Sequence, residues 1–159
     1  MNSNFLFPNR FKILGWILFV PSFIFGIVSR VLEIDFDKYL NLKVFAVYEA
    51  GIFSENKLFA WTENGFSDEI ILISIILGGI LIGFSKLKVE DEYIAKIRYE
   101  SLVWATYFNF GFLLFSTLFI YGSAYYDIMI VNIFSMLFFF IVRFHYMILK
   151  LQKTENDDE

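Results

Sequence analysis

The chain contains no cysteine and a single histidine, His145, among its 159 residues. Without cysteine it has no disulfide, no thiolate metal site and no thiol-based redox chemistry. One histidine cannot supply a multi-histidine iron site or a bis-histidine haem within one chain. These shortages exclude several common metal and redox centres, and we expect a protein that is not an enzyme and has no cofactor and no metal.

Charged residues are also scarce, and they are unevenly distributed. They make up 19% of the chain, whereas hydrophobic residues make up 58% and the mean hydropathy is +0.61. Ordinary soluble domains contain about 45–50% apolar residues. The charges lie between long apolar runs, which is the pattern of a chain whose hydrophobic runs are solvated by lipid. The net charge of −4 does not favour a nucleic-acid partner.

Four apolar runs are candidates for crossing a hydrocarbon core about 30 Å thick. We therefore predict an all-α integral membrane protein with a single domain, a four-helix transmembrane bundle. The shortest apolar run, residues 70–84, can be extended by Phe66 and Leu87 to reach across. We expect residues 151–159 to form a frayed, disordered tail. The predicted spans are residues 13–32, 66–87, 100–122 and 126–149.

Residues 33–65 form the longest connection between predicted spans. Two segments rich in β-forming residues, 40–48 and 57–62, flank the turn-forming sequence AGIFSEN at residues 50–56. We predict a small extracytoplasmic β-hairpin in this outer loop, between the first two helices. Its expected role is to cover helix ends, and a ligand-sensing surface is the alternative.

Residues 86–105 carry the densest charge in the chain. We predict that residues 88–101 form a cytoplasmic helical start to the third span, because apolar residues recur there at spacings of three and four. The acidic triplet Glu90, Asp91 and Glu92 would lie in the first turn, where the helix dipole favours negative charge. The same triplet is a candidate docking surface for a cytoplasmic protein. The predicted stripe comprises Val89, Tyr93, Ile97, Ser101 and Trp104.

Arg143 lies inside the fourth apolar run, where an unpaired guanidinium is costly. Counting along both spans from the region of Ala124 places Arg143 level with about Ala105, with Glu100 within reach. We predict a Glu100–Arg143 ion pair, and the alternative is an arginine that snorkels to the headgroups. The candidate intramembrane polar cluster comprises Glu100, Arg143, His145 and Tyr99.

Gly79 and Gly83 in the second span have the spacing that lets a neighbouring helix approach closely. We expect this pair to pack inside the bundle, and a homodimer face is the alternative.

Lysine and arginine lie before the first span, between the second and third, and after the fourth, whereas the connection at residues 122–127 has none. The positive-inside rule therefore predicts that both termini are cytoplasmic and that the hairpin is on the outer side.

Five motifs, in this order along the chain, resemble a group of small, uncharacterised bacterial four-span membrane proteins. They are FPNRFKILGW, KVFAVYE, ENGFSDEI, KVEDEYIAKIRYESLVWATYFNF and IVRFHYMILK. The resemblance covers most of the chain and implies a multi-pass protein of the bacterial cytoplasmic (inner) membrane, but it brings no activity, cofactor or functional residue. A looser likeness of residues 91–101 to small membrane proteins encoded beside helix-turn-helix regulators implies a cytoplasmic partner.

Two functions stay open, and a third, a membrane enzyme with acid–base chemistry around Glu100, Arg143, Tyr99 and His145, is disfavoured by the missing cysteine and the single histidine. The first is a non-catalytic regulatory or scaffolding partner of a cytoplasmic protein, held in the lipid bilayer. The alternative is a small transporter or channel, which would be a homo-oligomer. Acids are missing from the membrane core of the first three spans, where proton-coupled exporters keep theirs, and this favours the first function.

Overall fold

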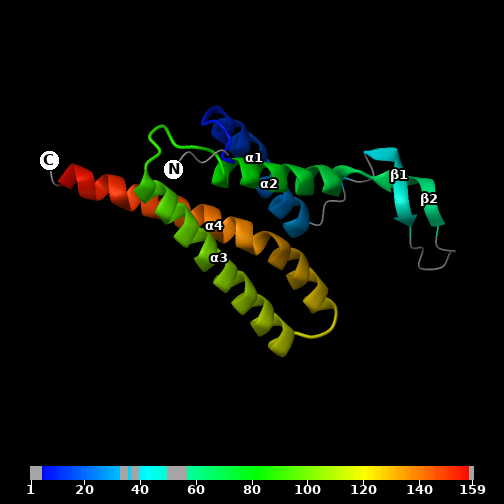
Figure 1. The fold of residues 1–159 in the computed structure, drawn as a ribbon. Helices are drawn as coiled ribbons and strands as arrows, with labels where there is room; N and C mark the ends of the chain where they lie inside the picture. Colours follow the sequence, from blue (N-terminus) through cyan, green and yellow to red (C-terminus); the bar gives the residue numbers. More distant parts are fainter. Residues whose placement is uncertain (1–4, 33–35, 37–39, 50–56, 158–159) are drawn as a thin grey trace. The chain divides into compact units, whose positions relative to one another are not determined.

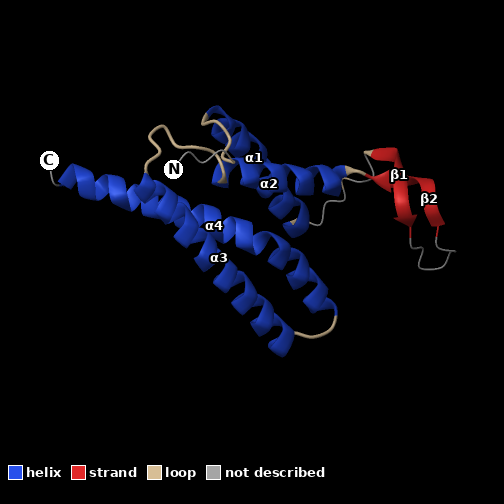
Figure 2. Cartoon of the chain, viewed as in Figure 1, coloured by secondary structure: helices blue, strands red, loops and turns tan. Residues whose placement is uncertain are grey.

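A computed structural model describes residues 5–32, 36, 40–49 and 57–157. Within these residues the protein is mostly helical, with one small antiparallel hairpin between its first two helices, as predicted (Figures 1 and 2). The predicted turn at residues 50–56 lies outside the described residues. The elements are α1 (Arg10–Val31), β1 (Asn41–Glu49), β2 (Lys57–Gly65), α2 (Ser67–Gly83), α3 (Glu92–Phe119) and α4 (Ser123–Asp157).

Three of the described helices, α1, α3 and α4, are long and apolar enough to cross a membrane. Only 11% of the most apolar stretch of α1 and of α3, and 22% of that of α4, is buried inside the protein. A fold that is stable in water would bury such faces, whereas lipid solvates them. These helices correspond to the first, third and fourth predicted spans. Helix α4 continues to Asp157, so residues 151–157 are helical and do not form the frayed tail that was predicted.

Helix α2 is shorter than the second predicted span. It has 17 residues, which extend about 26 Å at about 1.5 Å per residue, compared with a hydrocarbon core of about 30 Å. The helix ends at Gly83, and residues 84–91 form a loop instead of continuing it.

The chain divides into two compact units, and residues 18–75 form one of them. In this unit Gly26 of α1 lies close to the Ile71 side chain of α2. Strands β1 and β2 pair with Asn41 opposite Gly65 and Glu49 opposite Lys57. One face of the hairpin is aromatic, because the Phe45 ring contacts both Trp61 and Phe59, at centroid distances of 5.5 and 6.4 Å.

The other unit comprises residues 1–17 and 76–159. In it α3 and α4 form an antiparallel hairpin, visible in Figure 1 as two neighbouring helices joined by a short turn. Gly122 makes that turn with a φ of +74°, a conformation that glycine adopts without steric cost. The apolar core of the unit lies between these two helices and consists of Ile94, Ile97, Ala105, Phe140, Phe144 and Ile148.

Candidate functional site

Helix α3 begins at Glu92, later than the predicted helical start at residue 88. Asp91 is its N-cap, because the Asp91 carboxylate accepts a hydrogen bond of 2.7 Å from the backbone N–H of Ile94. An aspartate with extended backbone satisfies one of the free N–H groups of the first turn and thereby fixes where the helix begins. Residues 84–91 are consequently free to form a loop.

The segment before α1 is hydrogen-bonded to this loop. The N–H of Phe7 donates to the carbonyl of Phe84, and the N–H of Lys86 donates to the carbonyl of Phe7, both at 2.9 Å. The Asn9 side-chain amide donates to the carbonyl of Lys86 at 2.7 Å. These three bonds place the start of α1 beside the end of α2 and the start of α3.

Arg98 and Glu90 form an ion pair beneath the loop. Arg98 is only 7% exposed; its Nη1 donates to Glu90 Oε1, and its Nη2 donates to Glu90 Oε2 at 3.2 Å. The backbone N–H of Leu87 donates to the same Oε2 at 2.9 Å. The Arg98 guanidinium also lies 4.9 Å from the centroid of the Phe144 ring, which is a cation–π distance. A buried pair with this many partners is a strong constraint on the loop.

Lys12 lies near this pair, and His145 in turn lies close enough to Lys12 to be influenced by its charge. The Lys12 ammonium at the start of α1 is close enough to Arg98 and Glu90 to be influenced by both charges. Nδ1 of His145 lies 2.8 Å from the carbonyl of Ile141 and donates to it, so the neutral ring carries a lone pair on Nε2. The Trp16 ring lies edge-on to His145 at 5.5 Å. We call Lys12, Ser85, Glu90, Arg98 and His145 the inner polar cluster.

Three atoms of the inner polar cluster are buried without a hydrogen-bond partner among the described residues. They are Ser85 Oγ, Arg98 Nε and His145 Nε2. Buried polar atoms are usually paired, so this part of the molecule retains unused donor and acceptor capacity.

The predicted Glu100–Arg143 ion pair does not occur in the described part of the chain. Nη1 of Arg143 instead donates to the hydroxyl of Ser101 at 2.9 Å, and its guanidinium lies 5.7 Å from the Trp104 ring centroid. Tyr99 is 69% exposed, and His145 belongs to the inner polar cluster. The four residues predicted as one cluster therefore do not come together.

The ion pair is missing because Glu100 lies about 100° around the helix from the fully buried Ser101, which faces α4 and takes Arg143 as its partner. The level of the contact also differs from the predicted one. Contacts across the hairpin join Ser101 to Arg143, Asn109 to Ser135, and Thr117 to Tyr125. This register is centred on Gly122, whereas the prediction was centred on Ala124. A shift of about two residues at the turn displaces the paired residues by about four, which is one helical turn.

Asp91 and Glu92 of the acidic triplet are exposed and Glu90 is half-buried. The docking role of the triplet stays a prediction. Glu90 is engaged by Arg98 and Leu87, and the Asp91 carboxylate caps α3. The side chain of Glu92 is exposed. Two of the three predicted docking residues therefore have structural roles in fixing the loop.

Gly79 and Gly83 are both buried within the protein. A Cβ atom at Gly83 would lie 2.5 Å from Cε1 of Phe140 on α4. Gly15 of α1 makes a comparable approach to α2, where a Cβ would lie 2.9 Å from the carbonyl oxygen of Gly78. Gly83 thus packs closely against Phe140 inside the protein, and the homodimer face stays a prediction.

Sequence reasoning missed the role of Arg98. The predicted stripe included Tyr93 and Trp104, which are 53% and 55% exposed. The buried face of α3 is rotated by about one residue. A search for small and apolar residues at helical spacing would have found a stripe with an arginine inside it, which signals a buried ion pair. The buried residues of α3 are Ile94, Ile97, Arg98, Ser101, Ala105 and Ser116.

Polar contacts between α3 and α4 occur at separate levels of the hairpin. At the middle of the hairpin the Asn132 side-chain amide donates to the Asn109 backbone carbonyl at 3.3 Å. Beside this level the rings of Phe108 and Phe139 stack at 4.4 Å. In the described part of the hairpin the polar contacts therefore do not join into a continuous file.

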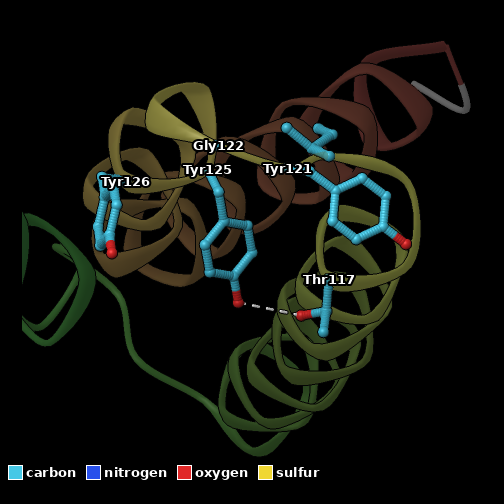
Figure 3. Close-up of a pocket in the computed structure, with 6 residues that line it drawn as sticks. Thr117, Tyr121, Gly122, Tyr125 and Tyr126 are labelled. Atoms are coloured by element: carbon cyan, nitrogen blue, oxygen red, sulfur yellow. Dashed lines mark hydrogen bonds between the residues drawn. The ribbon is translucent and has the colours of Figure 1, made fainter.

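A cavity of about 370 Å³ lies at the turn between α3 and α4. Figure 3 shows the Tyr125 hydroxyl directed at Thr117, at 3.2 Å, with Tyr126 on the far side of Tyr125. Its lining offers hydroxyl groups and aromatic rings but no charged side chain, which limits it to weak binding. The lining residues are Thr117, Ile120, Tyr121, Gly122, Tyr125 and Tyr126.

No set of three or more potential ligands that could hold a metal ion occurs among the residues that the structure describes. In comparisons with known proteins, no family model, no curated protein and no solved structure matches the chain.

Proposed function

We propose that the protein crosses the membrane four times, with α2 as the second span. The support is the hydrogen bonding of residues 7–9 to residues 84–86. If α1 crosses the bilayer, the chain must return before residue 84 to make these bonds, and α2 is the described helix available for the return. The mismatch of about 4 Å is small enough to be met by local thinning of the bilayer.

This arrangement puts both termini on the same side. Arg10, Lys12, Lys86 and Lys88 gather where α1 and α3 begin, whereas residues 120–126 at the opposite turn contain no lysine or arginine. The positive-inside rule makes the basic end cytoplasmic. We propose a bacterial inner-membrane location, with the hairpin of β1 and β2 on the outer side.

We further propose that the cytoplasmic end is a docking platform for a soluble protein, so that the molecule is a membrane scaffold or regulator without catalytic activity. Helix α4 has 35 residues, about 52 Å, so it extends well beyond a core of about 30 Å. Its end packs on the start of α3, since Ile148 and Leu151 belong to the same core as Ile94. Lys96, Lys150 and Lys153 are therefore exposed on two helices that are packed against each other at this end.

The alternative function, an oligomeric transporter or channel, has less support. The glycine spacing that suggested a dimer face is occupied within the protein by Phe140. The polar groups between α3 and α4 lie at separate levels, with stacked aromatic rings beside the Asn109 level. Because these polar groups do not form a continuous file across the membrane, the protein is better suited to a scaffolding role than to transport.

Photo-cross-linking in native membranes tests the docking platform. A photoreactive amino acid is placed at Lys96 or Lys150, and a matched control is placed at Tyr126, which lies at the opposite end of the α3–α4 hairpin and is 73% exposed. We expect one defined cross-linked product from Lys96 and Lys150 but none from Tyr126. The product from the Lys96 probe should disappear when Lys150→Glu and Lys153→Glu are combined with it. Equal cross-linking from both ends, or a product insensitive to the charge reversal, would contradict the proposal.

A further inference from the structure

Four basic residues from two distant segments meet at the end where α1 begins. The bond from the Asn9 amide to the Lys86 carbonyl brings the first turn of α1 beside the loop at residues 84–91. Arg10 and Lys88 are exposed, and Lys12 and Lys86 are half-buried. We call Arg10, Lys12, Lys86 and Lys88 the basic patch.

The acids nearest in sequence to the patch are already engaged. Glu90 is bound by Arg98, and the Asp91 carboxylate accepts from the backbone of Ile94. The Arg98–Glu90 pair carries no net charge, so it adds nothing to the charge of the patch. Asp91 and Glu92 keep their negative charges, but the four basic residues of the patch outnumber them, so the net charge at this end is positive.

The first turn of α1 makes this imbalance larger. It contains no acidic residue, and it carries Arg10 and Lys12 at the helix end where the macrodipole is positive. Cations at this end are unfavourable by themselves, and a bound anion would reverse the sign of the effect. The positive-inside rule accounts for basic residues at this position, and the first turn of α1 supplies no acid to offset them.

The patch lies next to the surface that faces lipid. Ile13, Leu14 and Ile17 follow it directly on α1 and are 65%, 45% and 61% exposed. Because α1 is apolar enough to cross a membrane, residues 10–12 lie at the level where acyl chains end and headgroup phosphates begin. The positive charge suits the anionic headgroup of a phospholipid, and the exposed apolar face of α1 beside it suits the acyl chains.

We propose that the basic patch binds the headgroup phosphate of an anionic glycerophospholipid, with the acyl chains along the exposed face of α1. Arg10 offers a planar pair of donors for phosphate oxygens, and the three lysines add mobile ammonium donors. The inference rests on the proposed membrane insertion but not on the docking platform, which involves Lys96, Lys150 and Lys153. A failure of one therefore leaves the other open to its own test.

Native mass spectrometry of the full chain in detergent tests the site. The purified protein is titrated with phosphatidylglycerol and, separately, with phosphatidylcholine of the same acyl chains. We expect selective retention of phosphatidylglycerol, and we expect its affinity to fall about fivefold for each basic residue removed from the patch. The test variant combines Arg10→Gln and Lys88→Gln, both of which replace exposed side chains.

The matched control combines Lys150→Gln and Lys153→Gln, which removes the same charge from exposed positions on α4. The control should retain the phosphatidylglycerol preference. Equal losses in the two variants would mean that net charge alone attracts the lipid, and equal retention of both lipids by the unmodified protein would mean that no anionic site exists. Either result overturns the proposal.

Two further measurements separate lipid binding from other causes. Millimolar inorganic phosphate should not displace the bound phosphatidylglycerol, because a free anion lacks the acyl chains; displacement would identify a phosphate site and contradict the lipid assignment. The combination of Arg10→Lys with Lys88→Arg keeps the charge and should keep the preference. If it loses the preference while its circular dichroism spectrum is unchanged, positive charge does not define the site and the proposal fails.

Discussion

The guanidinium of Arg98, on the buried face of α3, binds the carboxylate of Glu90. Arg98 follows Glu90 by eight residues in the chain. Glu90 lies in the loop and Arg98 in the second turn of the helix, so the pair connects the loop to the α3–α4 core. Phe144 of α4 lies against the same guanidinium, at 4.9 Å from ring centroid to Cζ. One ion pair thereby joins the loop, α3 and α4 into a single braced end.

Removing one partner of this pair should destabilise the protein strongly. Arg98→Met leaves the Glu90 carboxylate without its main partner, and we expect a loss of about 3–5 kcal/mol in the free energy of unfolding. Glu90→Gln should also destabilise, because Arg98 would keep its full buried charge. The measurement is equilibrium unfolding in mixed micelles, followed by circular dichroism.

A double-mutant cycle supplies the control for the Arg98–Glu90 pair. The combined variant Arg98→Met with Glu90→Gln should lose less stability than the sum of the two single losses, because no unpaired charge stays buried. Additive losses would show that the two side chains do not interact in the folded protein.

A side chain at Gly83 should disturb the packing of α2 against α4. Gly83→Val would put a Cβ 2.5 Å from the Phe140 ring, and we expect a loss of about 1–3 kcal/mol in the free energy of unfolding. Adding Phe140→Leu should recover part of that loss, because a smaller side chain leaves room for the valine. Thermal unfolding in detergent measures both effects.

Gly111 provides the matched control for Gly83, since a Cβ there would meet nothing within 4 Å. Gly111→Ala lies inside helix α3 and should leave stability unchanged or raise it by up to about 1 kcal/mol, because alanine favours the helix. If Gly83→Val were as harmless as Gly111→Ala, the close approach of α2 and Phe140 would be wrong.

The partner of Arg143 can be identified by mutation of neighbouring residues on α3. Ser101→Ala removes the hydroxyl that accepts from Arg143 at 2.9 Å, and we expect a loss of about 1–3 kcal/mol. Glu100→Gln should change stability by less than about 0.5 kcal/mol, because no ion pair joins it to Arg143. In cycles with Arg143→Met, coupling should appear for Ser101 alone. Coupling between Glu100 and Arg143 would restore the ion pair predicted from the sequence.

The apolar helices and the hairpin were predictable from the sequence because their signals are local. Apolar runs at residues 13–32, 100–122 and 126–149 are long relative to a bilayer, and the β-forming segments are separated by turn residues. Each of these patterns depends on neighbours within one element. They can therefore be recognised without knowing how the elements pack against one another.

The register of α3 on α4 was not predictable at the same level. It depends on whether the turn is centred on Gly122 or Ala124, and hydropathy does not separate these two residues. Likewise, the start of α3 depends on one side-chain bond, from the N–H of Ile94 to the Asp91 carboxylate. A polar pair such as Ser101–Arg143 depends on the register and on which face of α3 packs against α4, so the predicted partner of Arg143 was wrong by one residue.

The hydrogen bonds between residues 7–9 and residues 84–86 were not predictable from the sequence for another reason. Two of its hydrogen bonds, from the N–H of Phe7 to the carbonyl of Phe84 and from the N–H of Lys86 to the carbonyl of Phe7, join backbone groups, which every residue carries. Asn9 contributes a side chain, but its partner, the carbonyl of Lys86, lies far along the chain. No residue pattern announces a contact of this kind.

The four-span arrangement can be tested with single cysteines, because the natural chain contains none. Cysteine is introduced in separate variants at Phe5, Leu58, Lys88 and Tyr126, whose side chains are all exposed. Intact cells or sealed vesicles are treated with a membrane-impermeant maleimide, with permeabilised membranes as the reference. We expect labelling from the outer side for Leu58→Cys and Tyr126→Cys but not for Phe5→Cys or Lys88→Cys. If Lys88→Cys were labelled from the outer side while Phe5→Cys was not, α2 would not cross the membrane. This result would also mean that the bonds from residues 7–9 to residues 84–86 do not form in the membrane, because their two segments would lie on opposite sides.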